Sequence, residues 1–133
     1  MEIDLERFRE TFLQEAGEHV AQMVAGLHEL AIGDFNMRLL HAVLWKAHSI
    51  KGVAATFGLV RITEFTHAMR ILLDSMRGGQ VQVEKSLIDL LVEAADVLAA
   101  MLETARHGRP WPPEAEEMHE RLTAARVAGA MAA

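Results

Sequence analysis

Apolar residues recur every three or four positions through most of this 133-residue chain, with polar residues between them. This period is typical of helices that bury one face. No stretch alternates with the period of two that a half-buried strand requires, and the segment Val81–Val83 is too short to count. The pattern predicts five helices, at about residues 4–32, 36–57, 60–77, 84–107 and 112–127.

Glycines stand where these helices are expected to end. Gly33, Gly58, the Gly78–Gly79 pair and Gly108 each follow an apolar segment, and glycine adopts the left-handed conformation common just past a helix end. Pro112 and Pro113 suit the opening of the fifth helix. Acceptor side chains are expected at helix starts, and the candidates are Asp4, Asp34 or Asn36, and Glu84.

Short connections force successive helices to run antiparallel. The sequence therefore predicts an all-α fold: an up-down four-helix bundle with a fifth, C-terminal helix, in one domain over residues 1–128. Residues 129–133 are expected to form a frayed tail or the start of a linker. The apolar stripe of the first helix is expected to hold Leu5, Phe8, Phe12, Val20, Met23, Leu27 and Leu30, and the weaker stripe of the fifth helix Ala115, Met118, Leu122 and Ala125.

Composition excludes several classes of protein. The 13 basic and 19 acidic residues give a net charge of −6, which argues against nucleic-acid binding. The absence of cysteine excludes disulfides and thiolate metal sites and is typical of a reducing compartment. No apolar run approaches the roughly 18 to 20 residues of a membrane span, and residues 1–10 do not resemble a signal peptide. We expect a cytoplasmic protein without membrane insertion.

The seven histidines do not form a metal-binding pattern. A di-metal helical bundle needs the Glu-x-x-His spacing twice, and only Glu64 and His67 show it. The loop sequence that holds nucleotide phosphates is also missing. We expect neither a metal site nor a nucleotide site.

His48 lies near the middle of the second helix, one position away from its apolar series. Lys51 and Gly52 follow one turn later on the same face. A histidine with an ordinary pKa of about 6.5 is mostly neutral at pH 7, so it can attack and accept a phosphoryl group. The ammonium of Lys51 would offset the incoming charge, or it would simply be solvated.

Gly52 destabilises its helix by roughly 1 kcal/mol relative to alanine. Either the missing side chain admits a partner protein to His48, or the helix packs closely against a neighbour there. Leu44, Trp45 and Ser49 lie on or beside the same face and are candidate docking residues with Gly52. Trp45 either anchors a partner or covers the edge of the core.

The segment from His48 to Gly58 reads HSIKGVAATFG. It resembles the HSIKGxAxTFG signature of histidine phosphotransfer (Hpt) domains, and more narrowly the N-terminal phosphotransfer domain of CheA-type chemotaxis histidine kinases. The resemblance covers nearly the whole chain. It includes the FxxEAxEH pattern at Phe12–His19 and Thr66–Met69 in the third helix.

The resemblance implies a five-helix domain without catalytic activity of its own. His48 would be phosphorylated, through Nε2, by a CheA-type ATP-binding kinase domain, and would pass the group to an aspartate of a CheY-like or CheB-like receiver domain. Lys51 matches the lysine near the phosphoryl group, Gly52 the small position, and His67 a histidine near the active imidazole. The resemblance implies no bound cofactor, and ATP and Mg²⁺ would enter only through the kinase. The alternatives are an adaptor bundle that binds partner helices, which would take no phosphate, and a metal-binding bundle.

One position departs from the family pattern. CheA-type domains usually carry a glutamate one turn after His67, which accepts a hydrogen bond from the active histidine and fixes its tautomer. Arg70 stands there and cannot accept that bond. His67 or Glu64 could take over the orienting role, and Arg70 could pair with Asp74.

We therefore expect His48 to be phosphorylated at an unusual rate or with an unusual dependence on its kinase. A carboxylate at this position would orient the imidazole and raise its nucleophilicity, so Arg70→Glu should change the rate. The measurement is the phosphorylation kinetics of the two proteins with the same kinase. An unchanged rate would contradict the prediction.

Overall fold

The computed structural model describes residues 5–33 and 36–132, and within them every regular element is an α-helix. The helices are α1 (Leu5–Ile32), α2 (Met37–Thr56), α3 (Val60–Arg77), α4 (Lys85–His107) and α5 (Glu114–Ala132). The first four begin and end within one residue of the predicted bounds. Val81–Val83 forms no strand.

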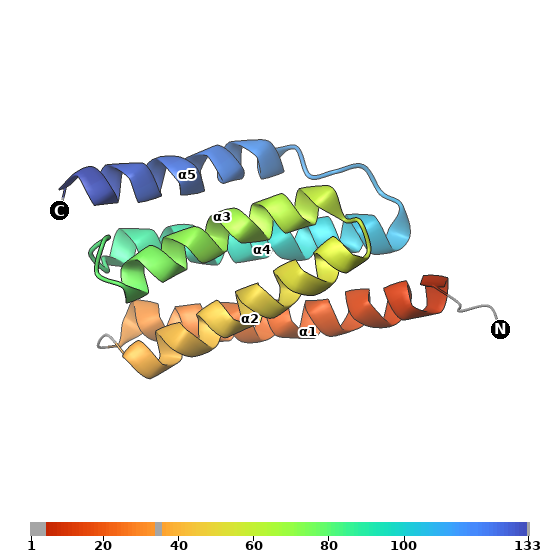
Figure 1. Cartoon of the computed structure of the whole chain (residues 1–133), viewed down its shortest axis with the longest axis horizontal. Coiled ribbons are helices and arrows are strands. Elements are labelled where there is room, and N and C mark those ends of the chain that lie inside the picture. Colours follow the sequence, from red (N-terminus) through yellow and green to blue (C-terminus); the bar gives the residue numbers. More distant parts are fainter. Residues whose placement is uncertain (1–4, 34–35, 133) are drawn as a thin grey trace.

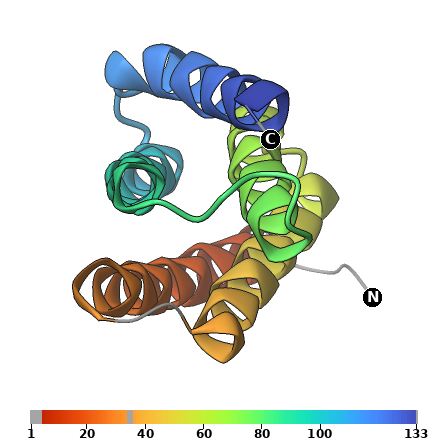
Figure 2. The ribbon, with the colours of Figure 1, turned by 90° about the vertical axis from the view of Figure 1, so that its left-hand side faces the viewer.

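Successive helices run antiparallel (Figure 1). Seen along the bundle, α1 to α4 surround a common interior, and α5 lies along the outside of α3 and α4 (Figure 2). The predicted up-down bundle with a fifth C-terminal helix is confirmed. Its interior is apolar, and its largest fully buried side chains are Met23, Leu27, Leu40, Ile50, Ile62, Phe65, Met69, Leu72, Leu73, Ile88, Leu91 and Leu98.

Among the stripe residues of α1 whose burial the structure describes, Phe8 alone is exposed, at 57%. It lies level with the end of α4, where the guanidinium of Arg9 donates a hydrogen bond to the carbonyl of Ala105 at 2.9 Å. The contacts that Arg9 and Glu10 make at this end of α1 are polar, and they leave the Phe8 ring uncovered.

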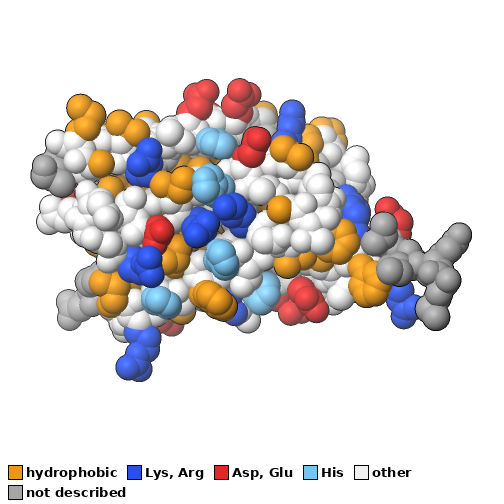
Figure 3. Space-filling view, viewed as in Figure 1, with side chains coloured by type: hydrophobic (Ala, Val, Ile, Leu, Met, Phe, Trp, Pro, Cys, Tyr) orange, Lys and Arg blue, Asp and Glu red, His pale blue; other side chains and the backbone are white. Residues whose placement is uncertain are grey.

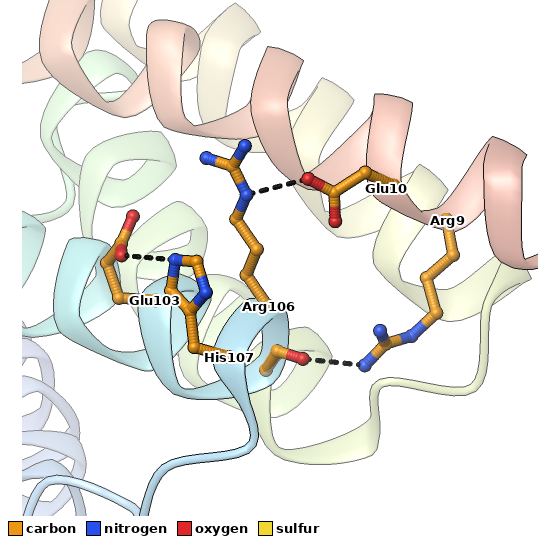
Figure 4. Close-up of polar contacts among 6 residues, drawn as sticks. Arg9, Glu10, Glu103, Arg106 and His107 are labelled. Atoms are coloured by element: carbon orange, nitrogen blue, oxygen red, sulfur yellow. Dashed lines mark hydrogen bonds and ion pairs between the residues drawn. The ribbon is translucent and has the colours of Figure 1, made fainter.

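Polar contacts join α1 to this end of α4 (Figure 4). Between the two helices, Arg106 Nε pairs with Glu10 Oε1 at 2.8 Å. Within α4, His107 Nε2 lies 3.2 Å from Glu103 Oε2. The carbonyl of Ala105, bound by Arg9, is one of the last four of the helix, which have no partner within it. Arg9 thus satisfies a helix end and holds two helices together.

The predicted caps have different outcomes. The Oδ1 of Asn36 accepts a hydrogen bond from the Leu39 amide at 3.2 Å, so Asn36 caps α2. Glu84 occupies the cap position of α4, but its side chain makes no capping bond. Asp4 and Asp34 lie outside the described residues.

Helix α5 differs from its predicted bounds at both ends. It begins at Glu114 because Pro112 and Pro113 form the turn before it, in which the Ala115 amide bonds the Pro112 carbonyl at 3.2 Å. It continues to Ala132, so residues 129–132, predicted as a frayed tail or the start of a linker, are helical. The reason is packing: a Cβ built on Gly129 would lie 2.7 Å from Cγ1 of the buried Val81, so this end of α5 rests on the α3–α4 loop.

A second close approach joins α1 to α2, and it leads to a stability prediction. A Cβ on Gly26 would lie 2.9 Å from Cγ2 of the buried Val43, whose branched side chain has little freedom to move. Overpacking costs about 1–3 kcal/mol, more than the roughly 1 kcal/mol gained by replacing a mid-helix glycine with alanine. Gly26→Ala should therefore lower the free energy of unfolding.

Gly17 provides the matched control in the same helix, because nothing lies within 4 Å of a Cβ built there. Gly17→Ala should raise the free energy of unfolding by roughly 1 kcal/mol. Urea denaturation of both variants measures the two effects. A Gly26→Ala protein as stable as Gly17→Ala would show that α1 and α2 are not in close contact at this point.

Candidate functional site

His48 lies on the outer side of α2. The inner side of this helix is buried between its neighbours through Leu40, Val43, Leu44, Ala47, Ile50 and Ala54. His48 follows Ala47 by one residue, a rotation of about 100° around the helix, and its side chain is exposed. The alternation of core and surface along α2 therefore brings the imidazole to water.

The imidazole of His48 stacks on the indole of Trp45. Their ring centroids are 5.8 Å apart and their planes meet at 28°. Within the described part of the chain His48 makes no hydrogen bond, so neither His67 nor Glu64 orients it in this way. Among the described residues, the indole is the only aromatic ring that stacks on this imidazole.

Trp45 is 63% exposed, so it does not cover the edge of the core. Leu44, in contrast, is only 9% exposed and belongs to the core, which makes its prediction as a docking residue wrong. Ser49 is half-buried beside His48. The surface around His48 that a partner could contact therefore includes Trp45 and Gly52 but excludes Leu44.

Gly52 lies one turn from His48 on open surface. A Cβ built there would meet no atom within 4 Å outside its own helical backbone, so close packing against a neighbouring helix is not the reason for this glycine. Lys51 beside it is half-buried and has no carboxylate partner within the described part of the chain. Its positive charge is therefore available at the site.

Helix α3 brings a second basic group of residues against α2. Partial loss of water around the His67 ring, whose edge stays exposed, lowers its pKa below the ordinary 6.5. The positive charges of Lys51, Arg70 and His119 lower this pKa further. His67 is therefore mainly neutral at pH 7, in an electropositive surrounding.

The antiparallel register of α2 and α3 brings the backbone position of Arg70 level with that of His48. Lys51 on α2 lies close enough to His67 on α3 to act on its pKa. His48 lies one turn before Lys51 on α2, and Arg70 lies one turn after His67 on α3. Because the two helices are antiparallel, both steps go in the same direction along the bundle. The expected pairing of Arg70 with Asp74 is not formed, and Asp74 Oδ1 instead accepts a hydrogen bond from Arg77 Nη2 at 2.5 Å.

Helix α5 completes this side of the molecule with a residue to which the sequence pattern assigned no role. His119 meets Phe65 edge-to-face at 6.5 Å, and it lines a groove of about 420 Å³ between α3 and α5 together with Glu64 and His67. Figure 3 shows histidine and basic side chains gathered in a band over α5, α3 and α2. In the sequence, the only sign that His119 faces the rest of the bundle is its position next to Met118 in the apolar stripe. Its neighbours follow from the docking of α5 on α3.

Two further searches cover the described residues only. No group of three or more histidine, aspartate or glutamate side chains is placed to hold a metal ion among residues 5–33 and 36–132. In the same part of the chain, no helix is both long enough and apolar enough to cross a membrane.

The comparisons with known proteins agree with this geometry. The model of the Hpt domain family matches residues 7–128. The chain belongs to the Hpt domain family. The match includes His48 and its neighbours on α2 and α3, and it extends over most of α5.

Curated relatives of this Hpt domain are chemotaxis proteins named CheA. The protein from Salmonella typhimurium is 36% identical over 107 residues, which are 80% of this chain and 16% of the relative. The protein from Rhizobium meliloti is 34% identical over 106 residues, 80% of this chain and 14% of the relative. The chain thus spans about a sixth of the length of the curated relatives it matches.

A solved structure shares the fold. The phosphorylated P1 domain of CheA3, in a complex with CheY6 from R. sphaeroides, superposes with a TM-score of 0.84 at 20% sequence identity. The match covers 92% of this chain and 98% of the P1 domain. The five-helix arrangement of this Hpt domain is therefore that of the CheA3 domain.

Proposed function

We propose that this chain is a phosphocarrier domain of two-component chemotaxis signalling. His48 accepts a phosphoryl group from ATP bound to a CheA-type kinase domain and passes it to an aspartate of a CheY-like or CheB-like receiver domain. The observation that carries the proposal is the exposed imidazole on α2, with Lys51 and open space at Gly52 one turn away, in a chain of the Hpt family.

The chemistry needs a nucleophile and local positive charge. In the first step the lone pair of His48 Nε2 forms a bond to the γ-phosphorus, while the bond from that phosphorus to the bridging oxygen breaks and ADP leaves with the electron pair. In the second step an aspartate oxygen attacks the phosphorus and the electron pair of the N–P bond returns to Nε2. Lys51, and Arg70 across from His48, supply positive charge that stabilises the phosphoryl oxygens during both steps.

The domain depends on other proteins for the phosphoryl donor and for the acceptor. We infer that ATP and Mg²⁺ enter only with the kinase domain, that no cofactor is bound by this chain, and that the exchange takes place in the cytoplasm, where ATP is the phosphoryl donor. The relatives named CheA and the complex of the CheA3 domain with CheY6 support this choice of partners. Both partners must reach one imidazole, so the surface around it has to stay open.

His48→Gln should abolish labelling while the fold persists. His48 is exposed and makes no hydrogen bond to a described residue, so its loss leaves the bundle intact. The measurement is acid-labile phosphate after incubation with radiolabelled ATP and a CheA-type catalytic domain, with circular dichroism as the check on folding. His41→Gln, an exposed histidine two turns earlier on α2, is the matched control and should label normally.

Retention of the label by His48→Gln would show that another residue is the acceptor. If the unmodified protein takes no label from any CheA-type catalytic domain, the chain is an adaptor bundle and the proposal is wrong.

Gly52→Ala should separate stability from function. A Cβ at this position meets no neighbouring atom, so the variant should gain roughly 1 kcal/mol in free energy of unfolding. The added methyl group would hold partner proteins away from His48, and displacing reacting groups by about 1 Å can slow a reaction on the order of a hundredfold. Phosphorylation and transfer to a receiver domain should therefore slow by roughly tenfold or more.

Gly17→Ala, which lies on α1 and is expected to add similar stability, is the control for a general effect of a more stable helix. It should leave both phosphotransfer rates unchanged. Normal rates for Gly52→Ala would show that partners do not approach over this glycine.

A further inference from the structure

Nothing in the described part of the chain offers His48 an acceptor that would fix its ring. Arg70 stands across from it on α3, and a guanidinium has no lone pair to accept the ring N–H. Glu64 and His67 make no hydrogen bond to it. An exposed histidine side chain in this situation would rotate freely about its χ2 angle, whose energy profile is broad.

The indole of Trp45 removes much of this freedom. The centroid distance of 5.8 Å and the angle of 28° lie within the range of offset-stacked aromatic pairs. Trp45 precedes His48 by three residues, so both side chains leave the same face of α2 and the helix itself sets their spacing. A ring stacked in this way restrains the plane of the imidazole.

The orientation of the ring plane matters for the reaction. The lone pair of an imidazole nitrogen lies in the plane of the ring, so this plane determines the direction from which phosphorus can be attacked. Holding it before the donor arrives reduces the entropy lost in reaching an in-line geometry. We propose that Trp45 is a positioning residue, which holds the imidazole of His48 in the orientation for phosphoryl transfer by stacking on it. This inference rests on the proposed function of His48.

Trp45 is exposed, so it could instead serve as an anchor for a docked protein. A small phosphoryl donor distinguishes the two roles, because it needs no docking surface. With phosphoramidate, His48 Nε2 bonds to phosphorus, the P–N bond of the donor breaks, and ammonia leaves after taking up a proton. A positioning residue affects this reaction, whereas a docking anchor does not.

The experiment compares the phosphoramidate rates of the unmodified protein, Trp45→Ala, Trp45→Phe and Met37→Ala. Loss of an aromatic contact of this strength should slow Trp45→Ala by roughly two- to tenfold, and Trp45→Phe should restore most of the rate because phenylalanine can also stack. Met37→Ala removes another exposed apolar side chain of α2, about three turns from His48, and should react normally.

Nuclear magnetic resonance adds a readout of the stack itself. The ring current of Trp45 should shift the carbon-bound protons of the His48 ring in the unmodified protein, and this shift should disappear in Trp45→Ala and persist in part in Trp45→Phe. The readout does not depend on any partner protein.

The outcomes separate this proposal from the proposed function. Normal phosphoramidate rates for Trp45→Ala, together with slower labelling by the kinase domain, would make Trp45 a docking anchor and overturn the positioning role. Absence of the ring-current shift in the unmodified protein would overturn it as well. Failure of the proposed function would appear differently, as absence of label on His48 from ATP and kinase while the stack is still observed.

Discussion

The burial of one side of α2 determines where the rest of the site can lie. Leu40, Ala47 and Ile50 are held in the core between α1 and α3, and the helical period then directs His48 and Gly52 away from it. A change of register in this helix would bring the imidazole into an apolar interior. The exposed position of the imidazole is therefore a consequence of core packing, and Lys51 follows it one turn later on the same helix.

Local charge at the site is opposite in sign to that of the whole chain. The net charge is −6, and several cations are neutralised by pairs away from His48, including Arg77 with Asp74 and Arg106 with Glu10. Lys51 and Arg70 have no carboxylate partner in the described part of the chain, and their charges add to the effect of burial in lowering the pKa of His67. A phosphoryl dianion would thus find positive charge beside His48 that no internal carboxylate has already neutralised.

The sequence predicted most of the fold because helix ends are decided locally. Asn36 caps α2, and Gly108 takes the left-handed conformation after α4, both for reasons that involve only neighbouring residues. The sequence did not predict the burial of Leu44 or the exposure of Phe8, because burial depends on how far neighbouring helices surround a position. The extent of α5 and the place of His119 depend on contacts between distant segments, such as Gly129 with Val81, which periodicity does not encode. The sequence shows the i, i+3 spacing of Trp45 and His48, but only the fold shows that the two rings stack.

Orienting an imidazole and selecting its tautomer are separate tasks, and this site divides them. A carboxylate that accepts the ring N–H performs both, because it fixes the ring plane and decides which nitrogen keeps the proton. An indole stacked on the ring can restrain only the plane, since it has no lone pair that accepts the ring N–H. With Arg70 in place of an acceptor, the choice of tautomer is left to water and to the electrostatic field of Lys51 and Arg70. The stack therefore does not replace a carboxylate fully. In a domain that has only the stack, the ring proton should exchange between the two nitrogens more freely than in a domain with a carboxylate acceptor.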